Sequence, residues 1–350
     1  MSAATVAGAL VTPTGVLVTD AAPETPDWFA ARAAGITGTD LPKILGLSKY
    51  GNALSVWLDK RGEAPADEVG EAATWGHILE DPVAQEWAQR NAAVVERVGV
   101  LAHAEHGHRR ASLDRLVAPG TCPDGRDSVL LTALGGCGLE VKTRNAFVAG
   151  RWSDDIPDDV LAQVQWGLHV TGLHHMHVAV LIGGQELRQF RVDRDAALEA
   201  YLIEEADRVW QAYTDGIPPV AAPDRDGVLL DLLNRMYEAR EGDRDLDPAE
   251  ARKWLDQYAE GSVLVKEGDA LKTEAKTALV QLIDDGDRGL VDGQQAFTYR
   301  RPQPSTGMPA AAVKRLAKDQ PDTYAALVED GFITTTQGGP RFNVTAAKGD

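Results

Sequence analysis

The order of helical and strand-like segments constrains the fold of this chain more than any other feature. Helical patterns come first and occupy most of residues 26–91. Short β-rich segments follow, separated by Gly, Pro and Asp, at 94–103, 109–117, 128–134 and 138–143. A helix at about 158–172, a hairpin with a Gly-Gly turn and a long helix at 195–214 complete the pattern. This order predicts a mixed α/β fold whose central sheet, mostly antiparallel or mixed, is flanked by helices.

Shifts in composition predict four parts. Residues 1–25 are rich in Ala, Thr, Val and Pro without periodicity, which predicts a flexible N-terminal tail. Proline clusters near 218–223 end a domain expected at 26–218. Helical patterns at 228–240, 248–260 and 263–285 then predict a mainly helical extension over 225–300. The polar residues 301–350 are expected to be a partly ordered C-terminal segment with one more helix.

Charge and cysteine content restrict the classes of protein. The net charge of −18 argues against a nucleic-acid partner, because binding phosphates requires clustered Lys and Arg. The objection is weakened because binding depends on where charges lie, and a small basic channel can exist on an acidic protein. Two cysteines are too few for a disulfide framework or a four-thiolate zinc site, so reduced, incidental thiols are expected. No signal-like start or long apolar run is seen, and we expect a cytoplasmic protein that does not enter the membrane.

A pair of carboxylates and a lysine form the candidate catalytic group. In the segment LEVKT, strand alternation places Glu140 and Lys142 on one face and Val141 on the other, toward the core. Asp114, in SLDRL, is expected in a neighbouring strand. Two converging carboxylates supply hard oxygen ligands for Mg²⁺, and the lysine can orient water or stabilise charge at phosphorus. The tripeptide E-x-K alone is a weak signal, because such pairs occur on the solvated faces of many strands.

Several ordered motifs between about residues 27 and 215 strengthen this interpretation. They are RAAGITGTDLPKILGLSKY, VWLDKRGE, WGHILEDPVAQEW, RRASLDRL, GLEVKT and LAQVQWGLHVTG. Together they resemble the YqaJ-type viral recombinases related to lambda exonuclease, within the PD-(D/E)xK nuclease superfamily. The resemblance implies a restriction-endonuclease-like core. The segment 118–138 is longer than the usual family turn and is interpreted as an insertion.

The resemblance also assigns roles to further residues. Arg32 and Thr39 match positions that contact DNA at a 5′ phosphate, and Gln163 matches an active-site glutamine. Glu80 matches a helix glutamate, which the resemblance favours as a metal ligand. Without the resemblance, Glu80 would be taken as a helix-surface carboxylate. The family motif has proline directly after this glutamate, whereas Asp81 intervenes here, so the choice between Glu80 and Asp81 stays open.

What the resemblance implies about function is specific. It implies an exonuclease that uses Mg²⁺, with Mn²⁺ as a substitute, to digest linear double-stranded DNA from 5′ to 3′ in phage-type recombination. It also implies a homo-oligomer, in the family often a ring-shaped trimer, and a single-strand annealing protein as partner. A phage-encoded copy would work in the cytoplasm of the host cell. The alternatives are an endonuclease or helicase-linked nuclease of the same superfamily, and a non-catalytic module that binds DNA ends.

The remaining candidate functional residues could also have ordinary structural roles. Arg144, directly after the E-x-K strand, is a candidate DNA contact or an ordinary surface residue. Trp152 and Trp166 are interpreted as core residues in preference to base-stacking ones. Two histidine groups suggest zinc, but the first has no cysteine nearby and the second begins a hydrophobic strand. We therefore expect solvated strand edges or turns at His103, His106, His108, His174, His175 and His177.

Overall fold

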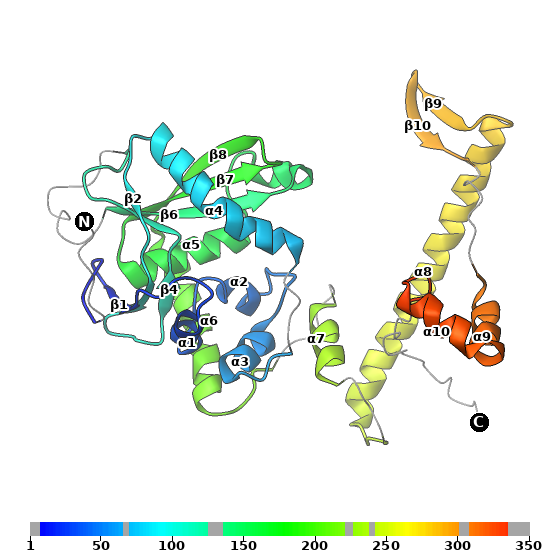
Figure 1. The fold of residues 1–350 in the computed structure, drawn as a ribbon, viewed down its shortest axis with the longest axis horizontal. Helices are drawn as coiled ribbons and strands as arrows, with labels where there is room; N and C mark the ends of the chain where they lie inside the picture. The colour runs from blue at the N-terminus through cyan, green and yellow to red at the C-terminus, as the bar shows by residue number, and fades with distance from the viewer. Residues whose placement is uncertain are drawn as a thin grey trace. The chain divides into compact units, whose positions relative to one another are not determined.

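A five-stranded sheet of mixed direction forms the centre of the larger of two compact units in the computed structural model (Figure 1). The structure describes residues 8–65, 70–124, 136–220, 227–237, 242–300 and 308–334. The sheet has the order β2-β5-β6-β7-β8. Its strands are β2 (Val95–Glu96), β5 (Arg115–Val117), β6 (Cys137–Arg144), β7 (His175–Ile182) and β8 (Glu186–Asp193).

The direction of each strand follows from its connection. Strands β6 and β7 are parallel, because the chain crosses back between them through η1 (Ala146–Trp152) and α5 (Asp158–Thr171). The other neighbours are antiparallel, and β7 joins β8 through the predicted Gly-Gly turn, where Gly183 and Gly184 both have positive φ. The expected mixed α/β fold with a central mixed sheet is confirmed. The strand expected at 128–134 lies outside the described residues.

A second sheet of three strands stands beside the first. It consists of β1 (Gly15–Thr19), β3 (Val100–His103) and β4 (Arg110–Ser112), paired antiparallel in the order β1-β3-β4. Strand β1 lies within the part expected to be a flexible tail, so that expectation is wrong for residues 15–19. Leu17 explains the difference, because it is 2% exposed in the hydrophobic core, where it stabilises the pairing with β3.

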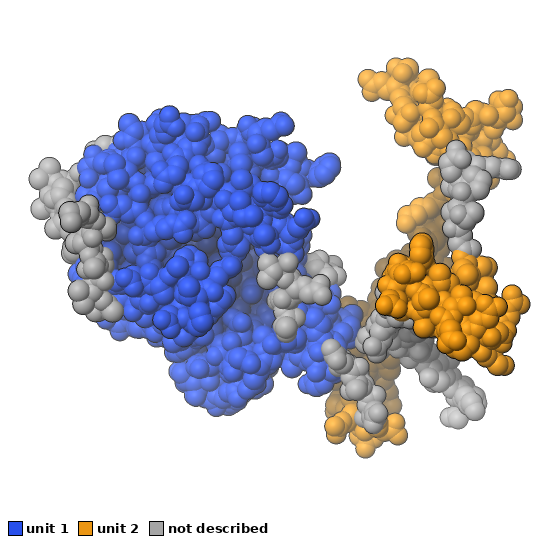
Figure 2. Space-filling view, in the orientation of Figure 1, with its two compact units in different colours: residues 1–238 blue, residues 239–350 orange. Residues whose placement is uncertain are grey.

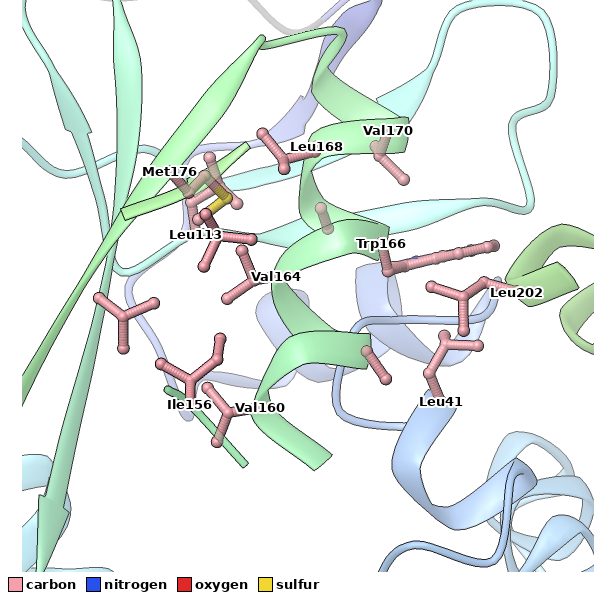
Figure 3. Packing of buried hydrophobic residues seen from close by; sticks show 14 of the residues in the cluster. Leu41, Leu113, Ile156, Val160, Val164, Trp166, Leu168, Val170, Met176 and Leu202 are labelled. Carbon is pink, nitrogen blue, oxygen red and sulfur yellow. The ribbon is translucent and has the colours of Figure 1, made fainter. Parts of the chain in front are cut away.

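Two helices cover opposite faces of the central sheet. On one face, Leu139 and Val141 of β6 join a buried cluster with Trp87 of α4 (Glu71–Arg90). On the other face, Met176 and Val178 of β7 join the core that includes α5. Alternation along each strand divides its apolar side chains between the two layers. Figure 3 shows this second layer at close range.

The amphipathic pattern of α5 places it between two neighbours. Val160, Val164 and Leu168 point toward the sheet (Figure 3). Trp166 points the other way, toward Leu202 of α6 (Ala196–Thr214) (Figure 3). Helix α5 is therefore packed between the sheet and α6.

Short helices fill the remaining side of this unit. They are α1 (Pro26–Ala33), α2 (Leu41–Ile44), α3 (Ala53–Arg61) and α7 (Val228–Met236). Helix α7 belongs to this unit because Leu232, 2% exposed, packs against Trp57 and Leu58 of α3. The unit extends to residue 238, beyond the domain end expected at 218.

The second unit covers residues 239–350 and is coloured separately in Figure 2. It contains α8 (Pro248–Ile283), β9 (Arg288–Val291), β10 (Gln294–Thr298), α9 (Ala310–Asp319) and α10 (Pro321–Glu329). One continuous helix, α8, replaces the two helices expected at 248–260 and 263–285. Gly261, which separated the two patterns, is tolerated inside it. Two helices occupy the region where one was expected.

Within the described residues, no helix is both long enough and apolar enough to cross a membrane.

Candidate active site

All the residues predicted for the site line a single cleft of about 570 Å³ in the first unit. The cleft is formed by the β6 strand, the bend before β5, the N-terminal half of α4, and the segments around α1 and α5. The predicted residues on its walls are Arg32, Thr39, Glu80, Asp114, Glu140, Lys142, Arg144 and Gln163.

Glu140, Lys142 and Gln163 form a closed set of hydrogen bonds. Lys142 Nζ donates to Glu140 Oε1 and to Gln163 Oε1, the latter at 3.0 Å. Gln163 Nε2 donates to the same Glu140 oxygen at 2.5 Å. Glu140 is 2% exposed, so these two hydrogen-bond partners must offset the free-energy cost of burying its charge. Strand alternation places the two charged groups on one face as predicted, while Val141 packs in the core on the other.

Asp114 lies in a bend between β4 and β5, one residue before β5, and not within a strand as expected. The bend turns its carboxylate toward β6, where Oδ2 accepts a hydrogen bond from the Val141 backbone N–H at 2.7 Å. Burial raises the pKa of Asp114 well above its usual range, and the negative charge of Glu140 raises this pKa further. The carboxylates of the partly buried Asp114 and the buried Glu140 therefore face the same space.

Arg115 is a component of the site that the sequence interpretation missed. Its guanidinium is almost fully buried and donates from Nη1 to Glu80 at 2.6 Å and to the backbone carbonyl of Asp114. Nη2 donates to Asp81 at 2.8 Å. Glu80 lines the cleft, whereas Asp81 points toward Arg115 and Arg97 and its side chain is 52% exposed. The geometry therefore places Glu80, and not Asp81, on the cleft wall.

Arg32 and Thr39 contact each other at one end of the cleft. Arg32 Nη2 donates to Thr39 Oγ1 at 2.6 Å, and the guanidinium carbon lies 4.5 Å from the centre of the Trp28 ring. Burial lowers the pKa of Arg32 from its ordinary value. Within the described part of the chain, no carboxylate lies within ion-pair distance of Arg32. A partly desolvated cation held by hydroxyl groups is well suited to an anion.

The loop that carries Thr39 is held by a buried ion pair. Asp40 Oδ2 lies 2.7 Å from Lys60 Nζ of α3 and also accepts hydrogen bonds from the Thr37 N–H and hydroxyl, both at 2.8 Å. Gly35 permits the close approach of this loop to the β3–β4 hairpin, because a Cβ there would lie 2.2 Å from the His108 carbonyl oxygen. Neither contact was predicted, since each joins residues distant in sequence.

The cleft is far less acidic than the chain. Its walls carry five basic and four acidic side chains, whereas the whole chain has a net charge of −18. The basic residues are Arg32, Arg97, Arg115, Lys142 and Arg144, and the acidic ones are Asp20, Glu80, Asp114 and Glu140. The acidity of the whole chain therefore does not extend to the cleft, so the net charge of −18 does not argue against a nucleic-acid partner at this surface.

Two tryptophans and two arginines near these motifs lie outside the cleft. Trp152 and Trp166 are buried, at 1% and 0% exposure, as core residues should be. Arg109 is buried and its Nη2 lies 2.6 Å from Asp207, away from the cleft. Arg151 lies 3.4 Å from Asp159 on the surface.

The histidines differ most from expectation. His175 and His177 are buried, so the expected solvated strand edge is wrong for them, whereas His174 is exposed. Both side chains point to the α4 face of the sheet, near Cys122 and Cys137. The first group is half-buried, with the His103 ring stacked on that of His169 at 5.1 Å. Sequence spacing could not predict the Cys–His cluster, because strand pairing alone brings residues 137 and 175 together.

Two carboxylates and a lysine at the junction of adjoining strands, on a mixed sheet flanked by helices, form the arrangement of the PD-(D/E)xK nuclease superfamily. A family model described as the YqaJ-like viral recombinase domain matches residues 27–174. The uncharacterized protein YqaJ of Bacillus subtilis (strain 168) is 31% identical over 282 residues, which are 77% of this chain and 82% of that protein. The chain belongs to the YqaJ-like viral recombinase family, as the sequence motifs indicated.

Two exonucleases are among the solved structures to which this chain is similar. An alkaline exonuclease (LHK-Exo) from Laribacter hongkongensis has 17% sequence identity and a TM-score of 0.44, and the match covers 55% of this chain and 94% of that one. A phage related exonuclease from Haemophilus somnus 129PT has 11% identity and a TM-score of 0.37, with 52% and 94% coverage.

Proposed function

We propose that this protein is a metal-dependent deoxyribonuclease that digests linear double-stranded DNA from its ends, 5′ to 3′, in phage-type recombination. The observation that carries the proposal is the convergence of Asp114, Glu140 and Lys142, with Gln163, on one cleft. This set supplies oxygen ligands for a cation and a positive charge beside them, which are the groups that phosphodiester hydrolysis requires. Membership in the YqaJ-like viral recombinase family supports the same class of reaction.

The donor set of the cleft fits a hard divalent cation. Glu140 is buried and Asp114 is partly buried; burial, followed by the negative charge of Glu140, raises the pKa of Asp114, and the two carboxylates repel each other. A divalent cation between them would offset this repulsion, with Glu80 as a third oxygen donor. We propose Mg²⁺, with Mn²⁺ as a substitute, because carboxylate ligands without sulfur or imidazole favour these ions. The bound cation would lower the pKa of a water molecule and polarise the scissile phosphate.

The other residues of the cleft then have separate tasks. Lys142 places an ammonium group beside Glu140, where it can stabilise the negative charge that develops on the phosphate oxygens. Gln163 holds both Lys142 and Glu140, so it fixes the orientation of each side chain. Arg115 holds Glu80 toward the cleft and ties it to the Asp114 backbone. The chemistry therefore requires positioned side chains from two sheet strands and two helices.

The end of the DNA strand would be bound at Arg32, Thr39 and Arg144. Arg32 can present two parallel N–H groups to a terminal 5′ phosphate, and the Thr39 hydroxyl can add a third hydrogen bond. Arg144 lines the cleft immediately after the β6 strand and can contact the DNA backbone. We further propose that the protein works in the host-cell cytoplasm as a homo-oligomer, on the family pattern a trimer, together with a single-strand annealing protein.

A nuclease assay on matched linear and circular duplexes tests the proposal. Digestion of the linear DNA with Mg²⁺ or Mn²⁺ is expected, with intact circular DNA and little activity with Ca²⁺, whose coordination is larger and looser. Nicking or linearisation of the circle would instead indicate an endonuclease. Binding to DNA ends with no digestion under any of these conditions would indicate a non-catalytic module, and digestion that resists EDTA would contradict the metal mechanism.

A further inference from the structure

Four metal-ligating side chains meet inside the first unit, outside the cleft described above. They are Cys122, Cys137, His175 and His177. All four are buried, and one ligand atom from each lies within 4.8 Å of those of the others. Neither cysteine forms a disulfide in this structure.

The distances between the ligand atoms resemble the edges of a small tetrahedron. Cys122 Sγ lies 3.2 Å from His175 Nε2, 3.5 Å from His177 Nε2 and 3.1 Å from Cys137 Sγ. A tetrahedral Zn²⁺ with ordinary Zn–S and Zn–N bonds separates its ligand atoms by roughly 3.3–3.8 Å. Small side-chain rotations would therefore convert the observed arrangement into a coordination shell. The two imidazole rings stand nearly perpendicular, at 87°, and present their Nε2 atoms to the same sulfur.

Three of the four ligands are placed by the sheet itself. The parallel register pairs Leu139 of β6 with His177 of β7, so Cys137, His175 and His177 all point to the α4 face. Glu140 and Lys142 point to the opposite face of the same strand. The sheet backbone therefore separates the Cys–His cluster from Glu140 and Lys142.

Cys122 reaches the cluster from the chain that follows β5. Residues 118–122 turn back on themselves, with a hydrogen bond from the Thr121 N–H to the Ala118 carbonyl. This turn places the Cys122 sulfur 3.1 Å from the sulfur of Cys137, the first residue of β6. A metal bound at all four side chains would link this turn to β6 and β7.

We propose that Cys122, Cys137, His175 and His177 bind one Zn²⁺ ion as a closed structural site. Binding would form two Zn–S and two Zn–N bonds, and the two thiol protons would be released to water. The two thiolates balance the charge of the ion, which suits a buried position. Four protein ligands leave no open coordination position, so the ion stabilises the fold and takes no part in phosphodiester hydrolysis. The proposal is independent of the nuclease function.

Two other interpretations of the cluster fit less well. A disulfide between the cysteines requires a sulfur separation of about 2.05 Å, and the observed separation is 3.1 Å. Asp124 is the nearest carboxylate, with an oxygen 3.8 Å from His175 Nε2 and 3.9 Å from His177 Nε2. A histidine–carboxylate cluster with Asp124 is the second interpretation, but the Asp124 carboxylate is already paired with Arg191 and lies outside the group of four ligand atoms.

Metal content and cobalt spectroscopy of the full chain test the site. The protein is purified under reducing conditions without chelator, and stoichiometric zinc is expected by mass spectrometry. Replacing the zinc with Co²⁺ should give a thiolate-to-cobalt charge-transfer band and the strong visible bands of tetrahedral Co²⁺. The charge-transfer band identifies the site, because the catalytic cleft has no sulfur ligand.

Matched variants separate the ligands from their neighbours. Cys137→Ser and His177→Ala should lose the charge-transfer band and the bound zinc, whereas His174→Ala, at the exposed neighbouring histidine, should keep both. If the ligand variants fail to fold, the wild-type protein gives a second measurement. Titration of its two thiols with a mercurial should release the zinc in proportion to the thiols modified.

The proposal is overturned if the folded, reduced wild-type protein binds no zinc and gives no cobalt–thiolate band. Zinc that stays bound after both thiols are modified, or in the folded Cys137→Ser variant, would likewise overturn it. Restoration of thermal stability in chelator-treated protein by Zn²⁺ but not by Mg²⁺ would support a structural site.

Discussion

At the scale of single residues, the candidate site depends on a few side chains whose charges are held by specific partners. Glu140 is buried, and its carboxylate is held by Lys142 and Gln163. Asp114 is partly buried beside it, and burial followed by the charge of Glu140 raises its pKa. Such an arrangement costs free energy in the absence of a cation, which supports the proposed metal site.

Substitution of the proposed catalytic residues should abolish digestion and leave DNA binding in place. For Asp114→Ala, Glu140→Gln and Lys142→Ala, we expect a loss of cleavage on the order of 100-fold or more, because each removes a ligand or the charge that acts at the phosphate. Initial rates on linear duplex DNA measure the loss, and circular dichroism checks folding. Near-normal activity in folded Glu140→Gln and Lys142→Ala would contradict the assignment.

The roles of Glu80 and Asp81 can be separated because both bind Arg115 but only Glu80 lines the cleft. Glu80→Gln should reduce cleavage by roughly 10- to 100-fold, as expected for a ligand or its immediate support. Asp81→Asn is the matched control and should change the rate little, because its side chain is half exposed. An equal effect of the two changes would show that the ion pairs with Arg115, and not metal binding, account for the loss.

Arg32 should determine the preference for a phosphorylated 5′ end. Arg32→Ala is expected to slow digestion of 5′-phosphorylated DNA by roughly 10- to 100-fold, the equivalent of one charged hydrogen bond. Arg32→Lys should restore only part of the digestion rate, because an ammonium group cannot form two parallel hydrogen bonds.

The comparison uses duplexes that differ only at the 5′ terminus. Arg61 offers a matched control, because its guanidinium also lies over a tryptophan ring, Trp57, at 4.7 Å but outside the cleft. Equal wild-type rates on the two ends, or an unchanged preference in Arg32→Ala, would remove this role from Arg32.

At the scale of elements, polar contacts between helix α5 and its neighbours position the site and make the fold sensitive to pH. One end of α5 supplies Gln163 to the cleft. Near the other end, His169 lies among Arg109, His103 and Glu199, the last of which is paired with Arg194. Burial and then the charge of Arg109 together lower the pKa of His169 to about 4.

The neutral form of His169 should therefore be required for full stability. The pKa of His169 is about 6.5 in the unfolded chain and about 4 in the folded chain. The contribution of neutral His169 to the free energy of unfolding is therefore complete above about pH 6.5 and is lost as the pH falls from 6.5 to 4. We expect the free energy of unfolding to fall by about 2–3 kcal/mol more over this range in the wild type than in His169→Gln.

Urea unfolding at several pH values measures this difference. Glutamine keeps a polar partner for Arg109 but does not titrate, so groups shared by both proteins cancel in the comparison. Parallel losses of stability in the two proteins would show that His169 is not the titrating group.

At the scale of the whole molecule, the cleft, the Cys–His cluster and the main core all lie in the unit that ends at residue 238. The second unit consists mainly of the long helix α8, on which no described side chain is buried. The boundary follows α7, because Leu232 covers Trp57 and Leu58.

A chain ending at residue 238 should fold, and one ending at 218 should be less stable. Loss of α7 exposes the apolar surface of Trp57 and Leu58, and Leu232→Ala in the full chain should cost about 2–3 kcal/mol for the same reason. Thermal unfolding of the two fragments and of the Leu232→Ala variant measures these effects. A fragment ending at 218 that is as stable as the longer one would place the boundary where the proline cluster predicted.

The sequence alone determined the features that depend on local periodicity or on short motifs. Alternation in LEVKT placed Glu140 and Lys142 together, the pattern at 158–172 predicted helix α5, and the ordered motifs indicated the family. These features involve residues close in the chain, so their geometry follows from the repeat of a strand or helix.

Tertiary structure alone decided what depends on contacts between distant segments. The pairing of β6 with β7 and the turn after β5 bring the two cysteines to His175 and His177. Arg115 meets Glu80, residues 15–19 join the second sheet, and Lys60 neutralises Asp40 for similar reasons. No sequence periodicity predicts these long-range contacts, because strand order, register and burial are set by the packing of the whole core.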